Sequence, residues 1–176
     1  KPLSMRITCH VDSPAGSGLG KSSTLVVSIL GAFAEWLKLP LGEYDLARVA
    51  YEIERIDLGM AGGKHDQYAA TFGGFNYMQF LQDDKVIVNP LRIRQRYQDE
   101  LAHNLLLYYT ETSHVSAKII QGQIDNVKAK NNDSRDAMHQ LKQQAVWMKE
   151  SLLRGDIDAI GEILNFGWEH KKRTEI

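Results

Sequence analysis

The apolar positions in the first part of the chain follow a strand period and then a helix period. Between Met5 and Val11 apolar and polar residues alternate, which predicts a strand with one covered face and one wetter face. From Ser22 to Leu37 apolar residues recur at helical spacing, which predicts an amphipathic helix that Pro40 ends. The apolar face of that helix is Leu25, Val26, Ile29, Leu30, Phe33, Trp36 and Leu37.

Helical spacing returns from Asp45 to Leu58 and predicts a second helix, which Gly59 stops. The residues expected to face inward are Leu46, Val49, Ala50, Ile53 and Ile56. Strand-like residues then occupy 75–80 and 86–88, and Asp83-Asp84 between them predicts a hairpin turn.

The second half of the chain is mostly helical in pattern. The apolar run from Leu105 to Tyr109 predicts a short buried strand. Helical segments are expected at about Ser113–Lys128, Asp133–Leu153 and Asp156–Lys171. The order of these elements predicts an α+β fold.

Composition excludes several classes of protein. The 176 residues suffice for one domain or two small ones, and 43% of them are hydrophobic, as in ordinary globular proteins. With a formal net charge of −1, nothing draws the whole molecule toward nucleic acid or an anionic membrane. Cys9 is the single cysteine and cannot form an internal disulfide, which favours a reducing, cytoplasmic setting. No apolar run reaches the roughly 18 residues that span a bilayer.

A loop rich in glycine and serine separates the predicted strand from the helix at Ser22. A glycine loop between a strand and a helix is typical of a phosphate site, because the backbone and the free amides of the helix start can approach an anion. One interpretation is a relaxed P-loop over Ala15–Ser22, with Lys21 at the phosphates and Ser22 on Mg²⁺. Against it, Ala15 replaces the first glycine, and polar residues interrupt the strand that should be continuously apolar.

The other interpretation is a family resemblance. Residues Pro14–Ser23 resemble the ATP-binding loop of the GHMP kinases, whose pattern is Pro-x-Gly-x-Gly-Leu-Gly-Ser-Ser-Ala; Lys21 and Ser23 depart from it. The resemblance continues through Tyr51–Arg55 and through Gly63-Lys64-His65-Asp66-Gln67, which resembles the second catalytic stretch of these kinases. Gly73–Asn76 is similar to sugar kinases of heptose and fucose metabolism, especially the bacterial D-glycero-D-manno-heptose phosphate kinases.

The resemblance implies a GHMP-kinase fold. Residues 1–90 would form an ATP-binding N-terminal domain like domain 2 of ribosomal protein S5, and residues 91–176 the start of an α+β C-terminal domain. The family's N-terminal substrate motif and its C-terminal glycine-rich motif are not found in the sequence. We therefore expect the chain to correspond to the middle of such a kinase.

The resemblance also implies roles for individual residues. Asp66 would be the catalytic aspartate, and Ser22 and Glu54 would hold Mg²⁺. The same residues have simpler explanations, with Asp66 as a loop residue, Glu54 as a solvated helix residue and Ser22 as a helix cap. The residues expected to bind ATP are Pro14, Ala15, Gly16, Ser17, Gly18, Leu19, Gly20, Lys21, Ser22 and Ser23, and those expected to bind substrate are Gly62, Gly63, Asp66 and Gln67.

The function implied is that of a sugar kinase. ATP would phosphorylate the anomeric hydroxyl of a sugar, namely a heptose carrying a 7-phosphate, for nucleotide-sugar synthesis. Thr110, Ser113 and His114 are further candidates for sugar contacts. The alternatives are a P-loop kinase or NTPase, and a non-catalytic module that binds a nucleotide or a sugar phosphate. The sequence leaves the oligomeric state open.

Overall fold

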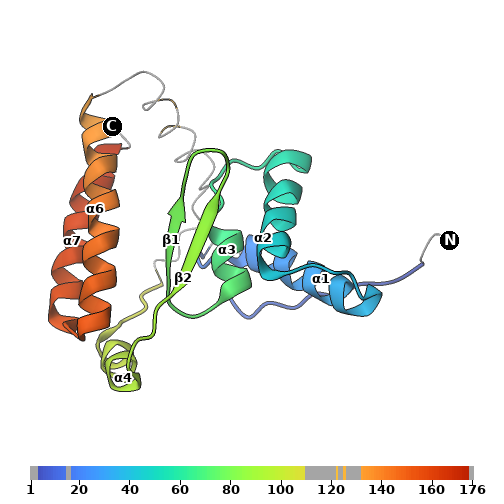
Figure 1. Cartoon of the computed structure of the whole chain (residues 1–176), viewed down its shortest axis with the longest axis horizontal. Helices are drawn as coiled ribbons and strands as arrows, with labels where there is room; N and C mark the ends of the chain where they lie inside the picture. The colour runs from blue at the N-terminus through green and yellow to red at the C-terminus, as the bar shows by residue number, and fades with distance from the viewer. Residues whose placement is uncertain (1–3, 15–16, 110–121, 123–124, 126–131, 175–176) are drawn as a thin grey trace.

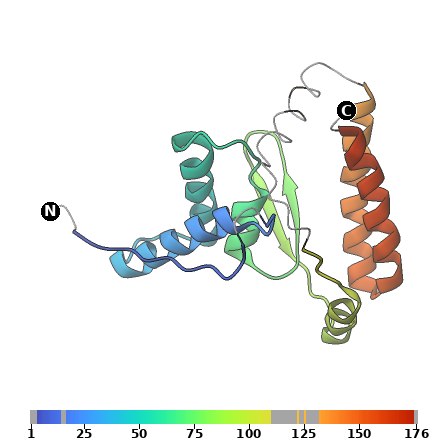
Figure 2. The same ribbon diagram turned by 180° about the vertical axis from the view of Figure 1, so that it is seen from behind.

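The computed structural model describes residues 4–14, 17–109, 122, 125 and 132–174. In chain order its elements are α1 (Lys21–Leu37), α2 (Glu43–Tyr51), the π-helical turn η1 (Glu52–Asp57), α3 (His65–Phe72), β1 (Asn76–Phe80), β2 (Val86–Pro90), α4 (Gln95–Asn104), α6 (Asn132–Arg154) and α7 (Ile157–Thr174). Figures 1 and 2 show the hairpin of β1 and β2 between a group formed by α1, α2 and α3 and the antiparallel pair α6 and α7.

The buried apolar residues form separate clusters on the two sides of residue 90. Ala47, Tyr68 and Val88 join α2, α3 and β2 in the first cluster. The second cluster joins the segment around α4 to α6 and α7 through Ile93, Leu101, Leu152, Ile157 and Ile160. Each group of elements therefore has a core of its own.

Most of the predicted helices and the hairpin are confirmed. Helix α1 begins at Lys21, one residue before the expected start, and α6 and α7 cover the last two predicted helices. Strands β1 and β2 pair antiparallel, with Met78 opposite Val88. Asp83 and Asp84 both have positive φ, 59° and 63°, as a tight hairpin turn requires.

The predicted helix over 45–58 is only partly α-helical. After Tyr51 the backbone changes to a π-helical turn, whose i→i+5 bonds place more residues in each turn and rotate later side chains around the axis. The buried positions are Ala47, Ala50 and Glu54, each with no exposed surface. The inward placement of Ile56 was wrong, because this side chain is 66% exposed.

Two predicted strands are not found. Residues 5–11 form no strand and run beside α1 (Figure 2), with Met5, Ile7 and Val11 exposed. Residues 105–109 are also irregular, and their apolar side chains are exposed rather than buried. Among the described residues the only strands are β1 and β2, which pair with each other, so neither segment has a ladder partner.

The predicted helix over about 113–128 cannot be compared, because nearly all of it lies outside the described residues. Within the described part of the chain, no helix is long and apolar enough to cross a membrane.

Candidate active site

The glycine loop leads directly into the first turn of α1. Gly20 precedes the helix with φ 67° and ψ 19°, a left-handed conformation that glycine adopts without steric cost. No side chain caps the helix at this position. The first amides of a helix have no intrahelical partner, and the helix dipole favours negative charge there. The start of α1 therefore has the geometry of a phosphate site.

A polar cluster, buried except at Ser22, joins this helix start to η1 and α3. The Ser22 hydroxyl donates to Glu54 Oε1 at 2.7 Å, and the Gln67 amide donates to Glu54 Oε2 at 2.6 Å. Gln67 Nε2 also lies 3.2 Å from the hydroxyl of Ser23. Glu54 and Gln67 have no exposed surface, and Ser23 is 3% exposed. Three polar residues from two distant parts of the sequence, Ser22 and Ser23 of α1 and Gln67 of α3, thus meet around the carboxylate of Glu54.

The cluster keeps Glu54 ionised. Burial by itself would raise the pKa of this carboxyl, but hydrogen bonds from Ser22, Ser23 and Gln67, together with the positive charge of Arg55, lower its pKa below the ordinary value of 4.5. A buried carboxylate is retained only when such partners offset its lost hydration. At neutral pH the site therefore holds a negative charge beside the start of α1.

The lowered pKa of Glu54 makes stability depend on pH. Since the pKa is lower in the folded chain, the stabilisation is complete above the unfolded pKa near 4.5 and is lost as the pH falls through the folded value. We expect the free energy of unfolding, measured by urea at a series of pH values, to fall in acid below pH 4.5. The decrease should be smaller in Glu54→Gln, whereas Glu52→Gln should follow the unchanged protein. An equal decrease in all three proteins would contradict this origin.

Asp66 lies in the first turn of α3, next to Gln67 in the sequence but turned toward a different set of partners. Its Oδ1 lies 3.0 Å from Nε2 of His65, and its Oδ2 lies 3.9 Å from Nη2 of Arg55. The Asp66 side chain is 38% exposed, so an incoming hydroxyl group can reach it. A half-exposed carboxylate held beside a cation is suited to orient a hydroxyl or to accept its proton.

The glycine-rich segment before α3 packs against Arg55. The guanidinium donates to the carbonyls of Ala61 and Gly63, both at 3.3 Å. Gly62 has φ 154°, and a Cβ built there would lie 2.6 Å from Arg55 Cζ. Arg55 was part of the sequence motif but received no role, because a sequence does not show which carbonyls an arginine reaches.

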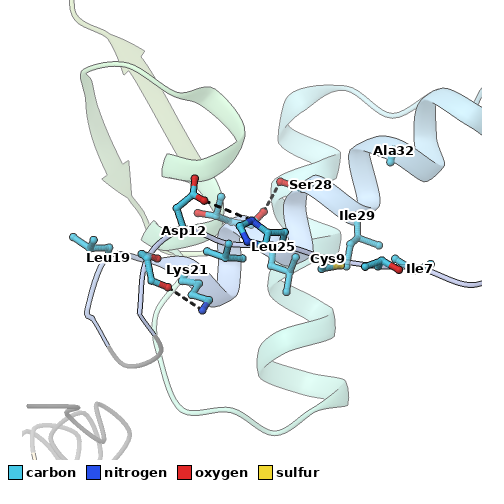
Figure 3. A pocket seen from close by; sticks show the side chains of 14 residues that line it. Ile7, Cys9, Asp12, Leu19, Lys21, Leu25, Ser28, Ile29 and Ala32 are labelled. Carbon is cyan, nitrogen blue, oxygen red and sulfur yellow. Dashed lines mark hydrogen bonds and ion pairs between the residues drawn. The ribbon is translucent and has the colours of Figure 1, made fainter.

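Lys21 points away from the Glu54 cluster. Its amine donates to the carbonyl of Ser13 at 3.2 Å. Both residues line an open cavity of about 510 Å³ between residues 7–13 and α1 (Figure 3). Successive helical residues are rotated by roughly 100°, so Lys21 and Ser23 leave the first turn on different sides. Leu25 and Ile29 line the same cavity as Lys21.

The donor set around Glu54 fits Mg²⁺. This cation prefers hard oxygen ligands, and it commonly binds one or two carboxylates together with substrate phosphates and water. Adjacent ligands at roughly 2.0–2.1 Å from an octahedral ion lie about 2.9 Å apart, close to the 2.7 Å between Ser22 Oγ and Glu54 Oε1. The buried Gln67 Oε1 finds no hydrogen-bond partner among the described residues. The described residues contain no group of three or more His, Cys, Asp or Glu able to hold a metal, so phosphate oxygens would complete the shell.

The structure thus brings together Ser22, Ser23, Glu54 and Gln67, and it places Asp66, Gly62 and Gly63 around Arg55. Pro14, Ser17, Gly18, Leu19 and Gly20 form the described part of the loop before α1. Ala15, Gly16, Thr110, Ser113 and His114 lie outside the described residues.

Known proteins are similar to this chain in sequence. A family model for the N-terminal domain of GHMP kinases matches residues 2–74. A D-glycero-alpha-D-manno-heptose 7-phosphate kinase of Campylobacter jejuni is 52% identical over 98% of this chain and 50% of its own length. An L-fucokinase/L-fucose-1-P guanylyltransferase of Bacteroides fragilis is 27% identical over 97% of this chain and 18% of its own length.

A solved structure agrees with these matches. The crystal structure of a D-glycero-D-manno-heptose 1-phosphate kinase from Bacteroides thetaiotaomicron has 52% identity and a TM-score of 0.76, covering 92% of this chain and 46% of that one. The chain spans about half of the length of the Campylobacter kinase and of the solved chain. Residues 2–74 thus match the N-terminal domain of the GHMP kinases, and the chain as a whole is similar to kinases of that family in sequence and in fold.

Proposed function

We propose that this chain is part of an ATP-dependent sugar kinase that phosphorylates the anomeric hydroxyl of a heptose 7-phosphate for nucleotide-sugar synthesis. The observation that carries the proposal is the meeting of Ser22 and Glu54 at the start of α1, with Asp66 on the adjoining turn of α3. The 52% identity to a kinase named for heptose 7-phosphate supports the choice of substrate. Cys9, unpaired and exposed, is compatible with a cytoplasmic enzyme.

The position of each side chain supports the role proposed for it. The loop before α1 and the first amides of the helix bind the phosphates of ATP. Ser22 and Glu54 would hold Mg²⁺, which would supply positive charge to neutralise the phosphates. Gln67 has no exposed surface, so within the substrate site it acts by fixing Glu54 rather than by touching the sugar.

Asp66 orients the attacking hydroxyl and accepts its proton as the sugar oxygen bonds to the γ-phosphorus of ATP and the bond from that phosphorus to the departing ADP breaks. Gly62 and Gly63 present backbone to the sugar beside it. Catalysis then depends on positioning and on charge stabilisation, without a covalent enzyme intermediate. The separate cores on either side of residue 90 support a domain boundary there, with residues 1–90 as the ATP-binding domain and 91–176 as the start of the next.

The P-loop alternative finds no support in the described structure. A P-loop follows a central strand of a parallel sheet, whereas the described strands form an antiparallel hairpin and residues 5–11 form no strand. The Lys21 amine donates a hydrogen bond to the carbonyl of Ser13, and its side chain leaves α1 on a different side from the Glu54 cluster.

The Lys21→Ser variant separates the two interpretations. Under the GHMP interpretation serine restores the residue usual in the family and removes one amine–carbonyl bond, so turnover in the intact protein should change by less than about 5-fold, since such a bond contributes about 1 kcal/mol. Under the P-loop interpretation the phosphate-binding lysine is lost and activity should nearly vanish. Steady-state kinetics with varied ATP measures the difference, with Lys38→Ser, at the exposed end of α1, as the control.

The proposed function is tested by incubating the intact protein with ATP, Mg²⁺ and a panel of sugars and sugar phosphates while ADP release is recorded. Heptose 7-phosphate should give the highest kcat/KM, and the product should carry a new phosphate on the anomeric carbon, as detected by phosphorus NMR. ADP release that no sugar accelerates would instead favour a nucleotide-binding module.

A further inference from the structure

Arg55 is largely buried and has three polar partners, two backbone carbonyls and one carboxylate. Its side chain is only 10% exposed, and it extends from η1 across the segment 61–63. Nε and Nη1 donate to the carbonyls of Gly63 and Ala61, while Nη2 faces Asp66 Oδ2 at 3.9 Å. One guanidinium therefore contacts both the glycine-rich segment and the carboxylate that follows it.

The guanidinium of Arg55 lies so close to the backbone of Gly62 that the contact depends on the absence of a side chain there. A Cβ at position 62 would lie 2.6 Å from Arg55 Cζ and 2.7 Å from Nη2, closer than real Cβ contacts allow. With φ 154° the position also has a backbone conformation that L side chains rarely adopt. Glycine at 62 is what lets the guanidinium lie against the backbone.

The shape of the guanidinium matters as well as its charge. Arginine presents several N–H groups in a rigid planar fork, so it can serve the two carbonyls and the carboxylate at once. A lysine ammonium supplies the charge, but it lacks the fixed geometry of the fork. A largely buried cation without those partners would be costly, so the contacts stabilise one arrangement of the segment.

Arg55 and Glu54 are neighbours in the π-helical turn but contact different partners. Glu54 faces Ser22 and Gln67, whereas Arg55 faces Asp66 and the glycine-rich segment. π-Helical turns inside helices occur frequently at functional sites. The turn η1 thus places the Glu54 side chain at the proposed metal site and the Arg55 side chain beside the proposed catalytic carboxylate of Asp66.

We propose that Arg55 is a positioning residue, which holds residues 61–63 in place and fixes the carboxylate of Asp66 for the attacking hydroxyl. The inference rests on the proposed kinase function and extends it to a residue that has no role there. Arg55 acts through Asp66 and the segment, so its loss should lower kcat and leave ATP binding nearly unchanged.

The test compares Arg55→Gln and Arg55→Lys with Arg48→Gln in the intact protein. Arg48 is a matched control, because it is about half exposed and pairs with Asp45 and Glu52 on the surface. Arg55→Gln should lower kcat roughly 10- to 100-fold, since a small misplacement of a catalytic group has effects of that order. The KM for ATP should stay within about 2-fold of the unchanged value, and Arg55→Lys should recover part of kcat because it restores the charge.

Hydrogen exchange gives a readout that does not need turnover. Amides of residues 59–66 should exchange faster in Arg55→Gln and not in Arg48→Gln, because local opening follows the loss of local contacts. Unchanged exchange, or a kcat equal to that of the Arg48 control, would overturn the inference. Faster exchange in a protein that phosphorylates no sugar would support the hold on the segment while refuting the kinase proposal.

Gly62→Ala covers the case in which Arg55→Gln does not fold. This variant keeps the arginine but displaces its guanidinium, so it should show the same kcat loss and the same faster exchange. Near-normal kcat and exchange in Gly62→Ala would overturn the inference.

Discussion

Asp66→Asn is expected to lower kcat of the intact protein by roughly 10²–10⁴-fold, the range for a positioned general base. Asparagine keeps the shape and some of the hydrogen bonding, but it removes the negative charge beside Arg55 and His65 and can no longer accept a proton. ATP binding should change little, because the proposed nucleotide site is the loop before α1 and not α3. Steady-state kinetics and equilibrium titration with ATP measure the two quantities separately.

The control for this substitution is Asp57→Asn, since Asp57 is exposed at the end of η1. It should behave as the unchanged protein does. A kcat near normal in Asp66→Asn would refute the assigned role. Joint loss of ATP binding and of cooperative unfolding would mean that Asp66 serves to anchor its loop through Arg55.

Glu54→Gln should affect both stability and the dependence on Mg²⁺. The carboxylate accepts from Ser22 on one oxygen and from Gln67 on the other. A glutamine has one oxygen and one NH₂ group, so either the buried Gln67 amide or the exposed Ser22 hydroxyl must lose its acceptor. Because water can reach Ser22, the expected cost is that of one lost hydrogen bond to a charged group, about 1.5–3 kcal/mol, which should appear as a lower free energy of unfolding.

The same substitution removes the negative charge from the proposed metal site. We expect kcat/KM to fall roughly 100-fold or more and the Mg²⁺ concentration for half-maximal turnover to rise, because the carboxylate is the strongest oxygen ligand there. Glu52→Gln is the matched control, since Glu52 belongs to the same turn but pairs with Arg48 at the surface. An unchanged Mg²⁺ titration would remove Glu54 from the metal site.

Local sequence signals were sufficient for the helices and the hairpin. Helix α1 has a long apolar stripe and a glycine before it, and the turn at Asp83-Asp84 has residues that tolerate positive φ. Elements of this kind are determined by residues within a few positions of one another. The assignment of Ser22, Glu54 and Asp66 as site residues came from the family resemblance. These residues lie far apart in the sequence, so no local pattern indicates that they meet.

The predictions that failed depended on distant partners. Alternation at residues 5–11 and the apolar run at 105–109 describe side chains that can be covered, but a strand also needs a neighbouring strand for its backbone groups. Among the described residues none pairs with either segment. The sequence patterns show which side chains of these segments are apolar, but they do not show whether a neighbouring strand is present.

By itself the sequence determined the order of most helices, the hairpin and the glycine-rich break before α1. Only the tertiary structure decided which side chains of residues 51–57 enter the site. Ala47, Ala50 and Glu54 lie on the buried face, Ile56 is exposed, and Arg55 lies across Gly62. Glu54 and Arg55 contact groups on α1 and α3, far along the chain, so the apolar periodicity of the segment could not show which of its faces is buried.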